Sequence, residues 1–166
     1  MTKAVLIGPP GSGKTTVGRL LSERLGVTCR DTDADVEAVA GKSVSDIFIE
    51  DGEERFRELE AAAVRAALDE HDGVVSLGGG AVLDERTQEL LSGHTVVYLE
   101  VGLSQAVQRV GLGTARPLLV FNPRSRLKQL MEQRRPIYER LATIKVNTDD
   151  REPEAVVDEI VKELAR

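Results

Sequence analysis

The chain alternates short apolar runs with longer stretches of helical spacing. After the first run, hydrophobic residues recur three or four positions apart, at Val17, Leu20, Leu21 and Leu25. This spacing places them on one face of a helix. The apolar runs span residues 4–7, 27–30, 74–77, 95–101 and 143–147. Strands that alternate with helices predict an α/β fold, with a parallel sheet covered by helices on both faces.

Single residues mark the expected helix ends. Gly26 follows the first helix as a C′ glycine does, Asp51 and Gly52 separate two helical segments, and Pro153 suits the N1 position of a last helix. Residues 111–126, "GLGTARPLLVFNPRSR", contain two glycines, two prolines and no clear period. Long loops inside compact domains are usually functional, so we expect a functional loop here that becomes ordered when it is needed.

Composition narrows the class of protein. With 166 residues, 41% hydrophobic and 30% charged, the chain suits one compact domain over residues 1–166. No apolar run approaches the roughly 20 residues of a membrane helix, so we expect a cytoplasmic protein with no membrane partner. The formal charge of −6 argues against general nucleic-acid binding. No long apolar stripe demands a dimer, so we expect a monomer.

Cys29 is the only cysteine of the chain. An internal disulfide and a cysteine-based zinc site are therefore both excluded. Because the residue falls in an apolar run, we expect a buried, inert thiol on a strand.

A glycine-rich segment, "GPPGSGKT", links the first strand to the first helix. Gly8, Gly13, Lys14 and Thr15 satisfy the P-loop pattern in its strand–loop–helix context. The glycines let successive N–H groups converge on phosphate oxygens, and the helix start adds its unpaired N–H groups. Lys14 would neutralise the β and γ phosphates, and the Thr15 hydroxyl would ligate Mg²⁺. The segment predicts a bound purine nucleoside triphosphate with Mg²⁺.

Two carboxylates follow the second strand in "RDTDAD". On a strand, the two-residue spacing of Asp31 and Asp33 points both to one side, at the end where open α/β sheets bind ligands. One can face Mg²⁺ through a water while the other faces an acceptor hydroxyl. The alternative is an N-cap cluster in which Thr32, Asp33 or Asp35 caps the next helix. The third strand lacks the Walker B aspartate that is expected there in many ATPases and GTPases. Asp31 is the better candidate for the role of that aspartate.

"LGGGAV" places three glycines, Gly78, Gly79 and Gly80, directly after the third strand. Three glycines are costly in chain entropy, so a backbone surface without side chains is indicated there, against which a small ligand can lie. A plain flexible turn is the alternative.

Positive charge concentrates late in the chain. An anion receptor is one explanation in a net acidic protein, and a solvated basic helix is the other. Arg116 lies inside the glycine- and proline-containing loop, where it has no evident structural role. The basic residues between positions 109 and 140 are Arg109, Arg116, Arg124, Arg126, Lys128, Arg134, Arg135 and Arg140.

Together these segments resemble the shikimate kinases, a branch of the P-loop kinases related to nucleoside monophosphate kinases. The likeness covers essentially the whole chain and is carried by "GPPGSGKTT", "DTD", "DIF…DGEERFRELE", "SLGGGAV", "ARPLL" and "RRPIYER". It implies a five-stranded parallel sheet, a mobile lid, and transfer of the γ-phosphoryl group of ATP to the 3-hydroxyl of shikimate, with Mg²⁺. The product would be shikimate 3-phosphate, an intermediate of aromatic amino-acid biosynthesis.

The resemblance also implies roles on the nucleotide side. Arg109 and Pro153 resemble the residues that bracket the adenine, and Arg116 resembles the lid arginine that closes on the phosphates. Asp31 is similar to the residue that reaches Mg²⁺ through water, beside Thr15. The remaining ATP-binding residues are Gly11, Ser12, Gly13, Lys14 and Thr16.

On the acceptor side, Asp33 resembles the residue that contacts and activates the hydroxyl. Arg57 of "FRELE" and Arg134 of "RRPIY" resemble the pair that grips the shikimate carboxylate, although the adjacent Arg135 competes with Arg134 for that role. The backbone of Gly78, Gly79 and Gly80 would line the other side of the ring.

Two other functions remain open at this point. A P-loop kinase for another small acceptor, such as gluconate or a nucleoside monophosphate, would share much of the machinery. A nucleotide-dependent switch is a different class, but the "NKxD" type of guanine-reading motif is missing from the chain.

Overall fold

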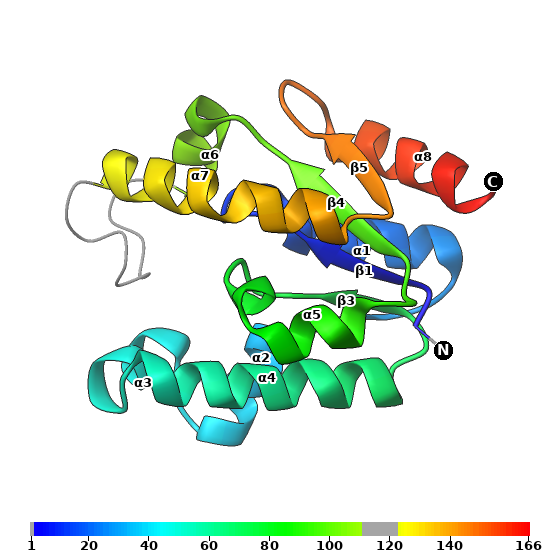
Figure 1. The fold of residues 1–166 in the computed structure, drawn as a ribbon. Helices are drawn as coiled ribbons and strands as arrows, with labels where there is room; N and C mark the ends of the chain where they lie inside the picture. The colour runs from blue at the N-terminus through cyan, green and yellow to red at the C-terminus, as the bar shows by residue number, and fades with distance from the viewer. Residues whose placement is uncertain (1, 111–122) are drawn as a thin grey trace.

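Five parallel strands form one sheet in the order β2-β3-β1-β4-β5 (Figure 1). The structure is a computed structural model and describes residues 2–110 and 123–166. The strands are β1 Ala4–Ile7, β2 Cys29–Asp31, β3 Val74–Ser76, β4 Val96–Glu100 and β5 Ile144–Asn147. The predicted parallel sheet is confirmed, with strand ends that shift by at most two residues.

Helices connect successive strands and begin and end close to the predicted residues. Gly26 takes the left-handed conformation after α1, with φ of 70°. Asp51 and Gly52 lie between α3 and α4, and Pro153 is the first residue of α8. The helices are α1 Lys14–Leu25, α2 Thr32–Ala40, α3 Val44–Glu50, α4 Glu53–Glu70, α5 Glu85–Leu91, α6 Leu103–Val110, α7 Pro123–Leu141 and α8 Pro153–Leu164, with a 3-10 turn η1 Ala81–Leu83.

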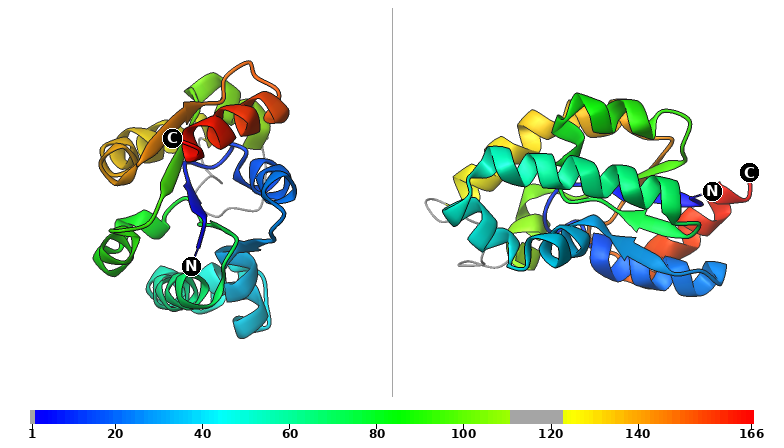
Figure 2. Two further views of the ribbon diagram at one scale, coloured as in Figure 1. Left: turned by 90° about the vertical axis from the view of Figure 1, so that its right-hand side faces the viewer. Right: turned by 90° about the horizontal axis from the view of Figure 1, so that it is seen from below.

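The two faces of the sheet bury separate hydrophobic clusters, because alternate strand residues point to opposite faces. On β1, Val5 and Ile7 pack with α4, α5 and α7, whereas Ala4 and Leu6 pack with α1 and α8. The views of Figure 2 show helices on both sides of the sheet. The predicted three-layer α/β arrangement is therefore confirmed.

A smaller cluster holds α2, α3 and the start of α4 together. Val36, Ile47 and Phe56 are its buried members, and they lie apart from the residues on either sheet face. This unit and the start of α7 both lie at the end of the molecule toward which the strands run (Figure 1). The fold thus places two separate structures at the carboxyl edge of the sheet.

Cys29 differs from expectation. It begins β2, the edge strand of the sheet, and is exposed because no strand in the described part of the chain covers its outer side. Its Sγ still turns toward α1, where burial raises the pKa of the thiol. The prediction of a strand position is confirmed, and the prediction of a buried residue is wrong.

None of the helices in the described ranges is long and apolar enough to cross a membrane.

Candidate active site

The P-loop wraps the start of α1 in a conformation that needs its glycines. Gly13 is the N-cap of α1 with φ of 91°, and Gly11 has φ of 81°, a region that residues with a Cβ rarely adopt. A Cβ on Gly11 would also lie 2.8 Å from the carbonyl oxygen of Ala106 on α6. The loop therefore packs closely on α6. Within the loop, the backbone N–H of Ser12 donates to the carbonyl oxygen of Pro9 at 3.2 Å.

Lys14 lies inside this loop. Its Nζ donates hydrogen bonds to the carbonyl oxygens of Gly8, at 2.8 Å, and Pro9, at 3.1 Å. The ammonium group is thus held above the loop's own backbone. Ser12 is 1% exposed, and its Oγ has no hydrogen-bond partner among the described residues.

A cavity of about 430 Å³ opens beside the P-loop. Its walls come from the start of α1, the junction of β2 with α2, the end of β3 and the end of α6. Thr15 and Thr16 line it from α1, and Asp31 and Asp33 line it from the β2–α2 junction. The structure therefore gathers both predicted carboxylates at the P-loop.

The local geometry of those carboxylates differs from the predicted one. Strand β2 ends at Asp31, so Asp33 already lies in the first turn of α2. The Oδ1 of Asp31 accepts a hydrogen bond from the backbone N–H of Asp33 at 2.8 Å, which makes Asp31 the N-cap. The expected strand alternation is wrong, because the helix begins one residue after Asp31. Asp35 instead pairs with Arg30 at 2.6 Å.

The three glycines after β3 are explained by close approach and not by unusual φ. None of them has a positive φ. A Cβ on Gly78 would lie 2.6 Å from Oδ1 of Asp33, and one on Gly80 would lie 2.6 Å from the guanidinium of Arg57. A Cβ on Gly79 would lie 3.3 Å from Nη1 of Arg134. The glycine backbone therefore has all three predicted acceptor-binding side chains pressed against it.

Helix α7 presents Arg134 to this glycine surface and turns Arg135 away. Tyr138 is four residues after Arg134, on the same helix face, and its hydroxyl donates to the carbonyl oxygen of Gly79 at 2.5 Å. Arg134 is 4% exposed, and its Nε has no hydrogen-bond partner among the described residues. Arg135 is exposed and faces Tyr98. A buried guanidinium with an unused donor suits an anionic ligand.

Arg57 is held by two glutamates of its own helix. Its guanidinium lies 2.8 Å from Glu60, which is buried, and 3.5 Å from Glu53, which is exposed. Burial raises the pKa of Glu60 to about 7, against the opposing effect of Arg57, and Asp33 raises it further while Arg134 lowers it. Glu60 therefore belongs to the same charged cluster as the predicted acceptor-binding side chains.

Arg109 joins α6 to the P-loop and to the segment just after β5. Its guanidinium donates to the carbonyl oxygen of Gly11 at 3.1 Å and to the carbonyl oxygen of Thr148, just after β5, at 2.8 Å. These bonds fix the plane of the guanidinium at the cavity wall. Pro153 begins α8 and is not one of the residues that line the cavity.

The oxygen donors at the cavity fit a hard divalent cation. Thr15 offers a hydroxyl, and Asp31 offers a carboxylate from the facing wall. No cluster of three or more histidine, cysteine or acidic residues in the described ranges could form a metal cage. Mg²⁺ typically keeps several waters and binds through one or two protein oxygens plus substrate phosphates. The residues present match that mode of binding.

Comparisons with known proteins agree with this geometry. The family model described as "Shikimate kinase" matches residues 10–165. A shikimate kinase from Thermobifida fusca is 62% identical over 161 residues, which cover 97% of this chain and 94% of the relative. The solved structure of shikimate kinase from Acinetobacter baumannii in complex with shikimate has a TM-score of 0.94 and 33% identity, covering 98% of this chain and 92% of that one.

The chain belongs to the shikimate kinase family. The predicted resemblance and P-loop kinase fold are thereby confirmed, and the chain is a kinase. A gluconokinase from Sinorhizobium meliloti 1021 has a TM-score of 0.62 at 22% identity, covering 98% of this chain and 91% of that one. A likeness of this kind shows a common fold only, so it gives gluconate no further support as the acceptor.

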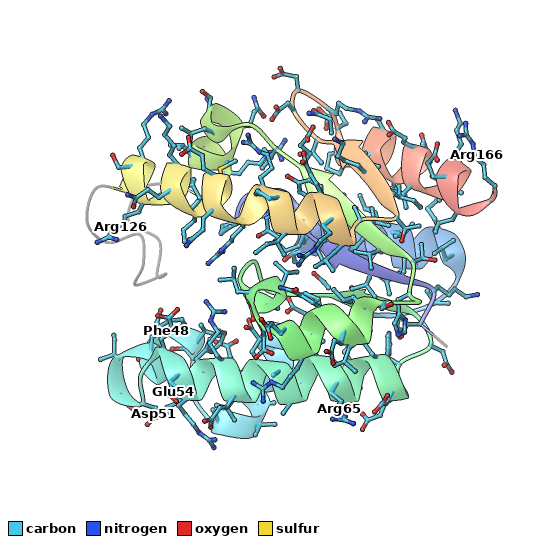
Figure 3. The ribbon with its side chains drawn as sticks, in the orientation of Figure 1. Phe48, Asp51, Glu54, Arg65, Arg126 and Arg166 are labelled. Atoms are coloured by element: carbon cyan, nitrogen blue, oxygen red, sulfur yellow. The ribbon has the colours of Figure 1, made fainter. Side chains whose placement is uncertain are left out.

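The predicted site and the described part of this shikimate kinase differ in two ways. Arg116, the predicted lid arginine, and most of the predicted lid lie outside the described residues. Arg126 is described and exposed, and it extends from the first turn of α7 at the same end of the molecule as Phe48 of α3 (Figure 3). Glu60 was missed, although its position three residues after Arg57 places both on one helix face.

Proposed function

We propose that this chain transfers the γ-phosphoryl group of ATP to the 3-hydroxyl of shikimate, giving shikimate 3-phosphate and ADP. Membership of the shikimate kinase family supports this activity. The observation that carries the proposal is the convergence of Asp33, Arg57 and Arg134 on the Gly78–Gly80 backbone, directly beside the P-loop. This arrangement suits a small acceptor with one carboxylate and a hydroxyl.

The P-loop would hold the triphosphate. Backbone N–H groups of Gly11, Ser12 and Gly13 would converge on phosphate oxygens, and the start of α1 would add Thr16 and its helix dipole. The Ser12 N–H would exchange its bond to the carbonyl oxygen of Pro9 for a phosphate oxygen. The Nζ of Lys14 would exchange its bonds to loop carbonyls for the β and γ phosphates. The positive-φ glycines already curve the loop around the start of α1, so we expect binding to need little backbone rearrangement.

Mg²⁺ is the proposed metal ion. The Thr15 hydroxyl would hold it directly, and Asp31 would reach it through a water. When bound, the ion neutralises charge on the phosphate oxygens. The hydrogen bond from Asp33 N to Asp31 Oδ1 orients this carboxylate, so the α2 N-terminus fixes the position of the proposed metal-facing group.

The acceptor would bind between the glycine backbone and the two arginines. Arg57 and Arg134 would grip the carboxylate with charge-assisted hydrogen bonds, and Gly79 and Gly80 would lie against the ring. Asp33 would then contact the 3-hydroxyl, orient it in line with the γ-phosphate and take up its proton as the phosphoryl group is transferred. Phosphoryl transfer otherwise depends on alignment and electrostatic stabilisation.

The remaining proposed contacts complete the nucleotide site. Arg109 and Pro153 would bracket the adenine, with the guanidinium of Arg109 held by Thr148 and Gly11. Arg116, in the proposed lid over residues 111–126, would close on the phosphates and help to exclude water.

We further propose that residues 1–166 act as a single domain and as a monomer in the cytoplasm, without a nucleic-acid partner. Large hydrophobic side chains that are exposed in the described ranges are few and comprise Val39, Ile49 and Leu83, which is a small apolar surface for a stable dimer. Light scattering coupled to size-exclusion chromatography tests this: one monomer mass supports it, and a concentration-independent dimer mass contradicts it.

Acceptor-dependent ATP consumption tests the proposed reaction. The assay contains Mg²⁺ and ATP, with shikimate, gluconate and AMP in parallel. Turnover that requires shikimate supports the proposal. ATP consumption that is independent of every acceptor, or that requires gluconate or AMP, contradicts it.

A further inference from the structure

Glu60 is a buried acid at the centre of the acceptor site. It lies on α4 and is only 2% exposed. Its Oε1 accepts a hydrogen bond from Nη1 of Arg57 at 2.8 Å. Arg57 in turn presses on Gly80. Glu60 therefore touches the anion-binding group itself and not only the surrounding core.

The charges around Glu60 balance only before the acceptor binds. Two cations, Arg57 and Arg134, face two acids, Asp33 and Glu60. Glu53 also faces Arg57, but at 3.5 Å and in an exposed position, so solvent screens it. An acceptor carboxylate would add a third negative charge to a cluster that has two positive ones. A buried excess charge is costly.

We propose that binding of the acceptor carboxylate is coupled to the uptake of one proton from solvent by Glu60. This inference rests on the proposed function. The proton forms an O–H bond on the Glu60 carboxylate and restores charge balance, while both arginines remain charged for the acceptor. Glu60 thus acts as a positioning residue whose protonation accompanies acceptor recognition.

The geometry allows Glu60 to keep its positioning role when it is neutral. A protonated carboxyl group retains a carbonyl oxygen that can accept from Nη1 of Arg57. The guanidinium therefore stays oriented, while the competition between Glu60 and the acceptor carboxylate for its positive charge is weaker. A pKa already raised to about 7 by burial means that little free energy is needed to protonate Glu60 near neutral pH.

Calorimetric titration of the protein with shikimate in buffers of different ionisation enthalpy measures the proton uptake. Binding should raise the pKa of Glu60 above its value of about 7, so that just above neutral pH the uptake is a measurable fraction of one proton per acceptor. The dissociation constant for shikimate should then rise up to about tenfold between pH about 6 and pH about 9. A binding enthalpy that does not depend on the buffer overturns the proposal.

Two variants on the same helix assign the proton to its group. Glu60→Gln keeps an oxygen for Arg57 but cannot titrate, so it should bind shikimate without proton uptake. Glu58→Gln is the matched control, because Glu58 is exposed and pairs with Arg55; it should retain the uptake. Uptake that persists in Glu60→Gln overturns the assignment.

A spectroscopic titration avoids any dependence on the folding of a variant. In wild-type protein with ¹³C-labelled glutamate carboxyls, the midpoint of the Glu60 signal should move to higher pH when shikimate is added. An unmoved midpoint contradicts the proposal. Failure of the proposed function is distinct, since it would leave no shikimate-dependent turnover, whereas failure of this inference would leave turnover and binding without proton linkage.

Discussion

The nucleotide half and the acceptor half of the site are built by different means. The proposed phosphate-binding part of the nucleotide half is one contiguous segment, Gly8–Thr15, which is shaped by positive-φ glycines. The acceptor half takes one side chain each from α2, α4 and α7, namely Asp33, Arg57 and Arg134, and seats them on three glycines with ordinary φ. In the first half, glycines allow backbone conformations with positive φ. In the second half, glycines leave room for neighbouring side chains to approach the backbone closely.

This difference predicts how each half responds to substitution. In the acceptor half, a single side chain can be changed while the P-loop keeps its backbone geometry. Variants of Asp33, Arg57 or Arg134 should therefore separate acceptor function from nucleotide affinity, and a variant that damages both would show that the halves are not independent.

The largest effect is expected for Asp33→Asn. Turnover should fall at least tenfold, and by as much as about 10⁴-fold if proton removal limits the reaction, because the amide cannot take up the hydroxyl proton. ADP affinity, measured by titration calorimetry, should stay within about twofold of wild type. Asp35→Asn is the control, since Asp35 pairs with Arg30 outside the cavity. Unchanged turnover in Asp33→Asn would remove Asp33 from the mechanism.

The next effect distinguishes two adjacent arginines of α7. Arg134→Ala should raise the KM for shikimate about 10- to 100-fold, because it removes a charge-assisted bond to the carboxylate worth about 1.5–3 kcal/mol. The KM for ATP should change little. Arg135→Ala, the matched control, should leave both constants within about twofold, because Arg135 is exposed and faces Tyr98. Equal losses in both variants would assign this part of α7 to folding.

A smaller effect is expected from Gly80→Ala, which tests whether space is the reason for the glycines. The new Cβ would lie 2.6 Å from the guanidinium of Arg57, so Arg57 must shift, and the KM for shikimate should rise about tenfold. In an Arg57→Ala background the same substitution should have almost no further effect. Additive losses in steady-state kinetics would show that Gly80 acts independently of Arg57.

The last and smallest effect is on the free energy of unfolding, which should depend on pH through Glu60 in the acceptor half. The pKa of Glu60 is raised to about 7 from 4.5, so the native state binds the proton more tightly than the unfolded state. Stability is therefore complete below pH about 4.5 and falls as the pH rises through 7, by up to about 3 kcal/mol from this group. Urea unfolding at pH about 5 and 8 should show a smaller decrease in Glu60→Gln than in wild type or Glu58→Gln. An equal decrease in all three would contradict the assigned cause.

The strand–loop–helix of the P-loop could be predicted from the sequence because its parts are adjacent in the chain. The strand, glycines, lysine and helix start all fall within Ala4–Leu25, and alternation of apolar residues predicted the sheet that holds them. Pro153 and Gly26 marked helix ends by backbone conformations that few other residues favour. Local physical rules were enough for these features.

The acceptor half depends on tertiary placement that local rules do not give. Spacing puts Arg134 on the same helix face as Tyr138, but only the packing of α7 shows that this face, and not that of Arg135, meets the glycines. Strand alternation misplaced Asp33, because the helix starts directly after Asp31. Cys29 was expected to be buried because it falls in an apolar run. The structure places β2 at the edge of the sheet, and the spacing of apolar residues alone does not fix the strand order that puts it there.

A crystal structure of the protein with ADP and shikimate would show directly whether the acceptor binds on the glycine backbone between Arg57 and Arg134. The shikimate carboxylate should bind Arg57 and Arg134, the ring should lie on Gly79 and Gly80, and the 3-hydroxyl should be within hydrogen-bonding distance of Asp33. A carboxylate bound by Arg135, or a ring seated away from the glycine backbone, would contradict it.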